Sequence, residues 1–174
     1  LRLRTGDAAQ AVDMALKGEV DIAIAARPDQ LSARLAFKPV VQVPLCFIAP
    51  KQNAGINETL NSGSIEWQNV PMILSETGLA RVRVEAFFKR QSIRPHIYAQ
   101  VSGHEAIVAM VALGFGVGVV PDLVLSNSPM VENVRVVPVH PELEPFSVGL
   151  CVLNNHLHSP LVQAFWQVSE QWLK

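Results

Sequence analysis

Residues 103–121, GHEAIVAMVALGFGVGVVP, constrain the fold of this chain most, because they predict a helix, a glycine stop and a buried strand in that order. Gly114 stands where the end of a helix favours a residue in the left-handed conformation. The run from Val117 to Val120 then predicts a short strand, which Pro121 ends. The apolar stripe of the preceding helix falls at helical spacing: Ile107, Val108, Val111 and Ala112.

The glycines of this stretch do not form a phosphate loop. Such a loop runs from a strand through glycines into a helix N-terminus, whereas here the helix comes first. The spacing also fails, because the third glycine of a G-x-G-x-x-G motif that starts at Gly114 would fall on Val119. If this element binds a small anion, the binding end is the start of the helix, at Ser102, Gly103 and His104.

Composition bounds the possible functions. The 174 residues are 49% hydrophobic and 17% charged, and the net charge is −1, which predicts a well-packed core and no basic nucleic-acid surface. No apolar run approaches the roughly 20 residues that span a bilayer. Cys46 and Cys151 are expected to be buried free thiols in a cytoplasmic protein, with a disulfide or a reactive thiol as the lesser alternative. We expect no cofactor and no metal, since nothing completes a site around His156 and His158.

The chain alternates strands and helices and is therefore predicted to be α/β. Residues 1–5 read as a strand, a helix capped by Asp7 follows over 8–17, and a buried strand covers 21–25, a series that favours parallel pairing. Residues 35–49 are rich in strand formers, but two prolines suit edge or crossing segments. Further strands are expected over 72–74, 98–101, 117–120, 134–139 and 146–152, and further helices over 80–91, 103–113, 123–125 and 160–173.

The central block has a strand–helix series of its own, whereas each flank is incomplete. We therefore expect residues 1–46 and 139–174 to form one lobe and residues 47–138 an inserted second lobe. Small ligands of such folds bind in the cleft between the lobes, outside the carboxyl ends of strands.

The candidate ligand-binding residues stand at strand ends. Ser75 and Thr77 follow a strand, where a polar turn is the plainer interpretation; Glu76 is a weaker candidate. Ser102 and Gly103 precede a helix whose N-terminus favours an anion, although Ser102 can also be its N-cap, in a capping box with Glu105. The set, with the residue expected in the cleft wall, comprises Ser75, Thr77, Ser102, Gly103, His104 and Gly116. Either Arg81 or Arg83 could add a cation, although surface arginines are usually solvated or paired.

Three motifs, in order along nearly the whole chain, resemble the regulatory domain of LysR-type transcriptional regulators. They are Leu16-x-Gly18-x-x-Asp21-Ile22-Ala23-Ile24, Arg81-Val82-Arg83 and the stretch VAMVALGFGVGVVP at 108–121. Further stretches, TGDAA at 5–9, GHEA at 103–106 and MVALG at 110–114, are similar to the branch of the family that controls branched-chain amino-acid synthesis. The C-terminal part of the sequence also agrees with that branch, at His158-x-Pro160-Leu161 and Ala164-Phe165-Trp166.

The resemblance implies a two-lobed, type 2 periplasmic-binding-protein-like fold whose first strand and helix of lobe I are missing here. It implies a small carboxylate co-inducer, acetolactate or acetohydroxybutyrate, and a homodimer or homotetramer formed through the regulatory domain, with helices 8–17 and 81–91 in contact. DNA would be bound only by an upstream winged helix-turn-helix domain that this chain lacks, and no membrane is involved. The alternative is a solute-binding protein or an enzyme on the same fold, which the lack of a signal peptide and of a nucleophile or metal set disfavours.

Overall fold

The computed structural model describes residues 1–6, 8–61, 65–169, and these divide into two compact units. Unit 1 comprises residues 1–43 and the segment from Phe146 onwards, and unit 2 comprises Pro44–Pro145. The chain thus passes between the units at 43/44 and 145/146, where the sequence led us to expect 46/47 and 138/139. The proposed cap at Asp7 lies outside the described residues.

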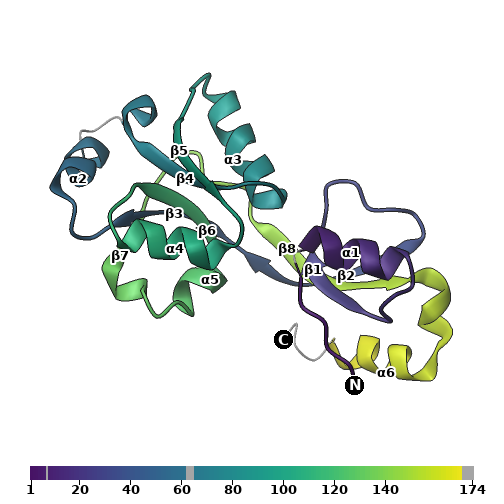
Figure 1. The fold of residues 1–174 in the computed structure, drawn as a ribbon. Helices are drawn as coiled ribbons and strands as arrows, with labels where there is room; N and C mark the ends of the chain where they lie inside the picture. Colours follow the sequence, from purple (N-terminus) through teal and green to yellow (C-terminus); the bar gives the residue numbers. More distant parts are fainter. Residues whose placement is uncertain (7, 62–64, 170–174) are drawn as a thin grey trace. The chain divides into compact units, whose positions relative to one another are not determined.

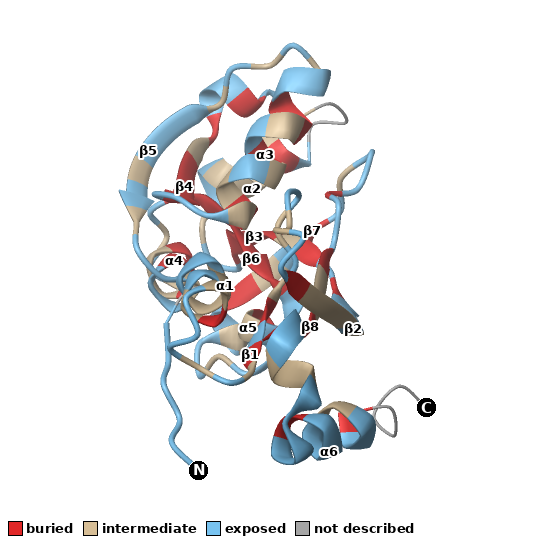
Figure 2. Cartoon of the chain, turned by 90° about the vertical axis from the view of Figure 1, so that its right-hand side faces the viewer, coloured by how far each residue is buried: buried red, intermediate tan, exposed pale blue. Residues whose placement is uncertain are grey.

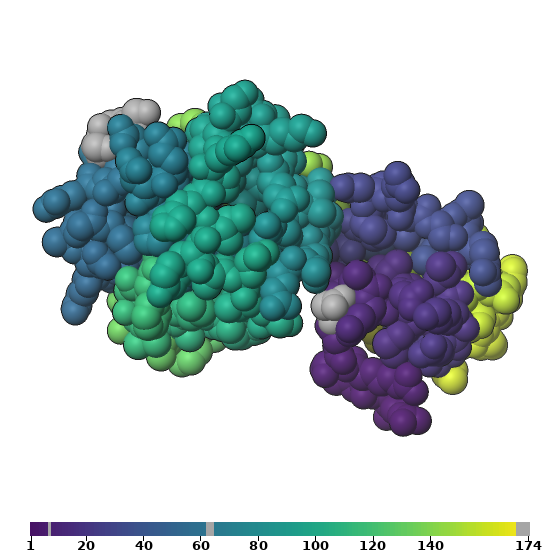
Figure 3. Space-filling model, turned by 45° about the horizontal axis from the view of Figure 1, so that its top comes forward, coloured from purple at the N-terminus to yellow at the C-terminus, as the bar shows by residue number. Residues whose placement is uncertain are grey.

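Unit 1 combines an N-terminal and a C-terminal segment of the chain, which the purple and yellow colours mark (Figures 1 and 3). Its sheet has the order β1-β8-β2, and β8 pairs antiparallel with both neighbours. The helix α1 packs on β1 and β8, where its Ala15 is fully buried against Ala23 and Cys151. The elements of unit 1 are α1 (Ala8–Leu16), β1 (Ala23–Ala26), β2 (Leu35–Val43), β8 (Phe146–Leu153), η3 (Asn154–His158) and α6 (Pro160–Val168).

Unit 2 is built on a five-stranded sheet of order β5-β4-β6-β3-β7. The strands β5, β4 and β6 run parallel, whereas β3 is antiparallel to both β6 and β7. The elements of unit 2 are β3 (Leu45–Pro50), α2 (Ala54–Leu60), η1 (Trp67–Asn69), β4 (Pro71–Ser75), α3 (Leu79–Arg90), β5 (His96–Val101), α4 (His104–Ala112), β6 (Val117–Pro121), α5 (Asp122–Ser126), η2 (Val131–Asn133) and β7 (Val134–Val137).

Helices cover both faces of this second sheet. Neighbouring residues of a strand point to opposite faces, so each strand offers apolar side chains to the helices on both sides. Ile48 of β3 packs with Ile107 and Val111 of α4 on one face. Phe47 points to the other face, where its ring lies 4.8 Å from that of Trp67 and 5.2 Å from that of Phe87 in α3. The central strands are accordingly the most buried part of unit 2 (Figure 2).

The expected glycine stop after α4 is confirmed. Gly114 has a φ of +88°, and its N–H donates to the Val111 carbonyl at 2.8 Å. The next N–H, that of Phe115, donates to the Met110 carbonyl at 3.2 Å, which completes a Schellman motif. The chain then enters β6, so the predicted order of helix, glycine and strand is correct.

Two expectations about strands are wrong. Residues 1–5 form no strand, and β1 pairs antiparallel with β8 instead of parallel with that segment. The edge or crossing segment expected around Pro39 and Pro44 is found, because β2 is an edge strand and the chain passes between the units at 43/44, whereas residues 45–50 form the interior strand β3. Pro44 precedes β3 and therefore removes no hydrogen bond from it; Pro39 does lie in the edge strand β2, beside an irregularity in register.

Candidate functional site

The parallel strands of unit 2 bring two candidate segments to one edge of the sheet. Ser75 of β4 is the register partner of Val101 of β5, and the Glu76 N–H donates to the Val101 carbonyl at 3.1 Å. Residues 75–78 and 102–104 therefore leave the sheet side by side. Ser75 is buried, with 9% of its surface exposed, whereas Thr77 and Ser102 are exposed. Five of the six candidate residues thus meet at this edge, which we call the β4–β5 corner (residues 75–78 and 102–104).

Each segment of the corner contains a glycine at the N-cap position of the helix that follows. Gly78 precedes α3 with a φ of +90°, and Gly103 precedes α4 with a φ of +88°. Within the described part of the chain, no side chain caps either helix, so the first amides of both keep their hydrogen-bonding capacity. Among the described residues, a Cβ on Gly78 would meet no atom within 4 Å, and a Cβ on Gly103 would come closest to Glu105 Oε2, at 3.7 Å. The space beside the Cα atom of Gly78 is therefore open, whereas the Glu105 carboxylate borders the space beside that of Gly103.

The proposed capping box of Ser102 and Glu105 is wrong. The N-cap is Gly103, so Glu105 occupies the second helical position rather than the third. The positive φ of Gly103 turns the chain after Ser102 and leaves the Ser102 hydroxyl outside the cap. The Glu105 carboxylate lies in the first turn of α4, where it interacts favourably with the positive end of the helix dipole.

His104 is the half-buried polar group of the corner. Its Nε2 atom is buried and has no hydrogen-bond partner among the described residues. Burial lowers the pKa of His104 from its ordinary value of 6.5, and the Glu105 carboxylate opposes this shift only in part. The imidazole is therefore mainly neutral near pH 7, and its Nε2 atom is a buried polar atom whose hydrogen-bonding capacity is unused among the described residues.

Gly116 lies at the opposite end of the parallel strands, where β6 begins. It immediately precedes β6, whose first residue, Val117, pairs with Met72 near the start of β4. A Cβ on Gly116 would lie 2.3 Å from the Pro71 carbonyl oxygen, so close backbone packing explains the glycine. The structure does not bring Gly116 to the corner, about 16 Å away along a five-residue strand.

Two of the three arginines of α3, Arg81 and Arg83, are less solvated than the sequence suggested. The side chain of Arg81 is 17% exposed and that of Arg83 is 12% exposed. Arg81 Nε pairs with Glu85 Oε1 at 2.6 Å, and Arg83 pairs with Glu144 Oε2 at 3.1 Å. Because each guanidinium is committed to a carboxylate, neither is the free cation that an anionic ligand would need.

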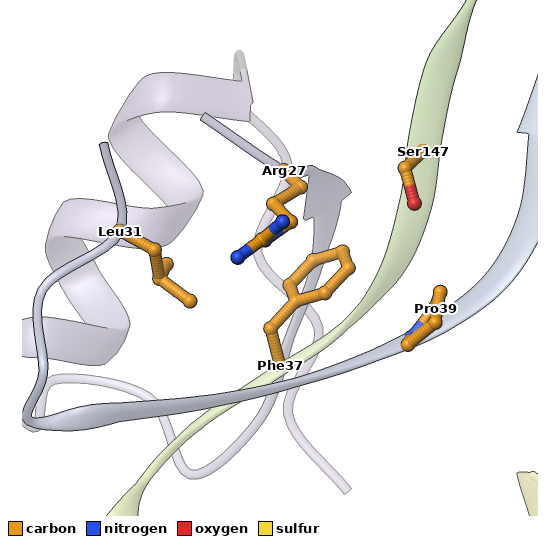
Figure 4. A pocket seen from close by; sticks show the side chains of 5 residues that line it. All are labelled: Arg27, Leu31, Phe37, Pro39 and Ser147. Atoms are coloured by element: carbon orange, nitrogen blue, oxygen red, sulfur yellow. The ribbon is translucent and has the colours of Figure 1, made fainter. Parts of the chain in front are cut away.

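Sequence reasoning missed a cavity in unit 1 (Figure 4). Arg27 follows β1, and its guanidinium extends between Leu31 and the Phe37 ring, 5.9 Å from the ring centroid. Among the described residues, no carboxylate forms an ion pair with Arg27. The cavity measures about 240 Å³, and Pro39 and Ser147 complete its lining. Its signal in the sequence is Arg27 itself, a cation that follows the strand expected over residues 21–25.

Both cysteines are free, as expected: Cys151 is buried and Cys46 is half-buried. Burial raises the pKa of each thiol, and for Cys46 the carboxylates of Asp122 and Glu142 raise it further. The described residues hold no cluster of three metal-ligating side chains. The helices found in this part of the chain are too short or too polar to cross a membrane.

The sequence matches the LysR substrate binding domain family over residues 1–174, and the chain belongs to this family. This is a family of ligand-binding domains of transcriptional regulators and not of enzymes. Among curated proteins, the chain is 39% identical over 171 residues to the HTH-type transcriptional activator IlvY of Salmonella typhimurium, strain LT2. It is equally similar to the HTH-type transcriptional regulator IlvY of Escherichia coli K12. Each match covers 97% of this chain and 58% of the relative, so the chain spans little more than half of these proteins.

Solved structures show the fold. The regulatory domain of Synechocystis CcmR, in complex with 2-PG, matches with a TM-score of 0.83 and 19% identity, over 99% of this chain and 83% of that one. The effector-binding domain of QuiR, in complex with shikimate, matches with a TM-score of 0.77 and 17% identity, over 96% and 78% of the two chains. The expected two-lobed, type 2 periplasmic-binding-protein-like fold is thereby confirmed.

Proposed function

We propose that this chain is the effector-sensing domain of an IlvY-like transcriptional activator, with unit 1 as regulatory lobe I and unit 2 as lobe II. The effector is a small hydroxy-keto carboxylate, acetolactate or acetohydroxybutyrate, and the regulated genes serve branched-chain amino-acid synthesis. The similarity to IlvY proteins supports the branch of the family, and the chemistry of the β4–β5 corner supports the class of ligand.

The pair of glycine-led helix ends carries the ligand assignment. A carboxylate needs several donors, and the first amides of α3 and α4 provide them together with the positive ends of two helix dipoles. The hydroxyls of Ser75, Thr77 and Ser102 suit the ligand's hydroxyl and keto oxygens, and neutral His104 adds one directional partner. A carboxylate with additional oxygens matches this donor set better than a purely apolar acid does.

The Arg27 cavity is a second feature of this chain that suits a carboxylate, because its guanidinium is a charged donor. Its remaining lining is mostly apolar, with only the Ser147 hydroxyl in addition. We therefore assign the effector to the β4–β5 corner of unit 2, and the Arg27 cavity of unit 1 is a separate, lesser candidate for binding the carboxylate.

The domain performs no chemistry in this proposal. Binding of the effector changes the relative population of regulatory-domain conformations, and an upstream winged helix-turn-helix domain transmits the change to DNA in the cytoplasm. A solute-binding protein or an enzyme on the same fold is disfavoured, because the curated relatives that we compared are named regulators of transcription.

Self-association into a homodimer or homotetramer is part of the proposal. Helix α3 and edge strand β5 expose apolar side chains that a partner subunit would cover: Val82 is 48% exposed, Ile97 38% and Tyr98 56%. Sedimentation of the full-length protein tests this surface. Val82→Glu is expected to shift the protein towards monomer, and Val41→Glu, at a site of similar exposure in β2, should leave the assembly unchanged.

Calorimetric titration of the full-length protein tests the effector. Acetolactate and acetohydroxybutyrate should bind, whereas valine, pyruvate and sulfate should bind at least about tenfold more weakly, since each lacks part of the matching set of oxygens. The double variant Ser102→Ala, His104→Ala should lose most of the affinity. Failure of both acetohydroxy acids to bind would reject the effector assignment without affecting the family or the fold.

A further inference from the structure

The Arg81 side chain donates hydrogen bonds to both strands that lead into the β4–β5 corner. Its Nη1 atom donates to the Ser75 carbonyl at 3.3 Å and to Gln100 Oε1 at 2.9 Å. Ser75 ends β4, and Gln100 is the penultimate residue of β5, so one side chain bonds to the ends of both strands. Its Nε atom pairs with Glu85 at 2.6 Å, one helical turn further along α3.

The position of Arg81 is electrostatically unfavourable for a cation. It lies in the first turn of α3, where the helix dipole favours negative side chains. A guanidinium is retained here with only 17% of its side chain exposed, because three acceptors lie around it and its planar fork can meet several at once. An ammonium on a flexible stem cannot reproduce this arrangement.

We propose that Arg81 is a positioning residue for the effector site, an inference that rests on the proposed function. It does not contact the effector. It fixes the spacing of residues 75–78 relative to residues 102–104, so that the first amides of α3 and α4 can donate hydrogen bonds to the same ligand. The structure thus assigns to Arg81 a role different from the ligand-binding cation considered from the sequence.

The test combines two measurements on the full-length protein. Affinity for acetolactate is measured by calorimetry, and the backbone amide resonances of residues 76–78 and 102–104 are recorded without ligand. Arg81→Lys keeps the charge and loses the fork, and we expect the affinity to fall about fivefold or more. The amide resonances of both segments should shift. Arg90→Lys, an exposed change in the last turn of the same helix, is the matched control and should alter neither.

Gln100→Met removes only the acceptor on β5 and protects the test against misfolding of the Arg81 variant. It should shift the resonances of residues 102–104 and weaken binding in the same direction as Arg81→Lys. Wild-type affinity in both variants, with shifts confined to α3, would overturn the inference. If the wild-type protein binds neither acetohydroxy acid, the proposed effector fails, and the amide resonances alone then decide whether Arg81 sets the spacing of the corner.

Discussion

The Cα atoms of Ser75 and Val101 are partners in the last pair of the parallel ladder between β4 and β5. Because both strands run in the same direction, the chain leaves both of them at the same edge of the sheet. The next few residues on each side contain a hydroxyl side chain and a glycine with positive φ, and each segment then begins a helix. This single register pairing creates the β4–β5 corner on which the proposed function depends.

The conformation of Gly103 gives the sharpest test of the corner. Gly103→Ala places a side chain at φ +88° and ψ +135°, a backbone conformation that L-residues rarely adopt, which costs on the order of 1–3 kcal/mol of folding free energy. Gly114→Ala is the matched control, because Gly114 has the same φ at the other end of α4. We expect a similar loss of stability from both changes in chemical denaturation, and a loss of effector affinity only from Gly103→Ala. Equal affinities of the two variants would argue against a ligand at the start of α4.

The pKa of His104 predicts how stability depends on pH. Burial holds this pKa below its ordinary 6.5 in the folded chain, so the unfolded chain binds more protons between the two values. Stability therefore falls as the pH drops through the window below 6.5. His104→Asn should remove this acid sensitivity, which urea denaturation at about pH 7.5 and about pH 5.5 would measure. An acid loss of the same size in the variant would assign it to other groups.

The charge of Arg27 is expected to contribute less to binding than the donors of the corner. Arg27→Ala, which changes unit 1 only, should weaken acetolactate binding by less than about twofold, because the proposed donors all lie in unit 2. The Ser102→Ala, His104→Ala variant should weaken it by more than about tenfold, because buried hydrogen bonds to the ligand are lost. Calorimetry of the two variants under the same salt conditions makes the comparison. A larger loss from Arg27→Ala would place the carboxylate in the cavity.

The ring cluster around Phe47 predicts where unit 2 is most sensitive to truncation. Phe47 is 1% exposed and packs against the rings of Trp67, Phe87 and Phe88. Phe47→Ala should destabilise the protein by about 3–5 kcal/mol, through lost burial and a cavity. Phe115→Ala, at a site that is 48% exposed, should change stability by no more than about 0.5 kcal/mol. Thermal or urea unfolding of both variants measures the difference, and comparable losses would contradict the packing described here.

Much of the local structure was predictable, because local chemistry determines it. The positive φ of Gly114 followed from its place after an apolar helical stripe, and the helix, stop and strand appeared in the expected order. The failures arose where pairing decides the outcome. Residues 1–5 have strand-like alternation but form no strand, and β1 pairs antiparallel with β8 rather than parallel with a preceding strand.

The sequence by itself determined the family, the α/β class and the segments from which a ligand site could be built, since motifs, periodicity and helix stops are local properties of the chain. Only the tertiary structure decided which of those segments meet. The register of β4 and β5 brings Ser75 and Thr77 beside Ser102, Gly103 and His104, and the parallel β4–β6 pairing leaves Gly116 at the opposite end of the parallel strands. The tertiary structure also shows that Arg81, a candidate cation for the ligand in the sequence, donates hydrogen bonds to residues at the ends of β4 and β5. Those relationships join residues far apart in the sequence, and such contacts depend on strand order and register, which no local pattern specifies.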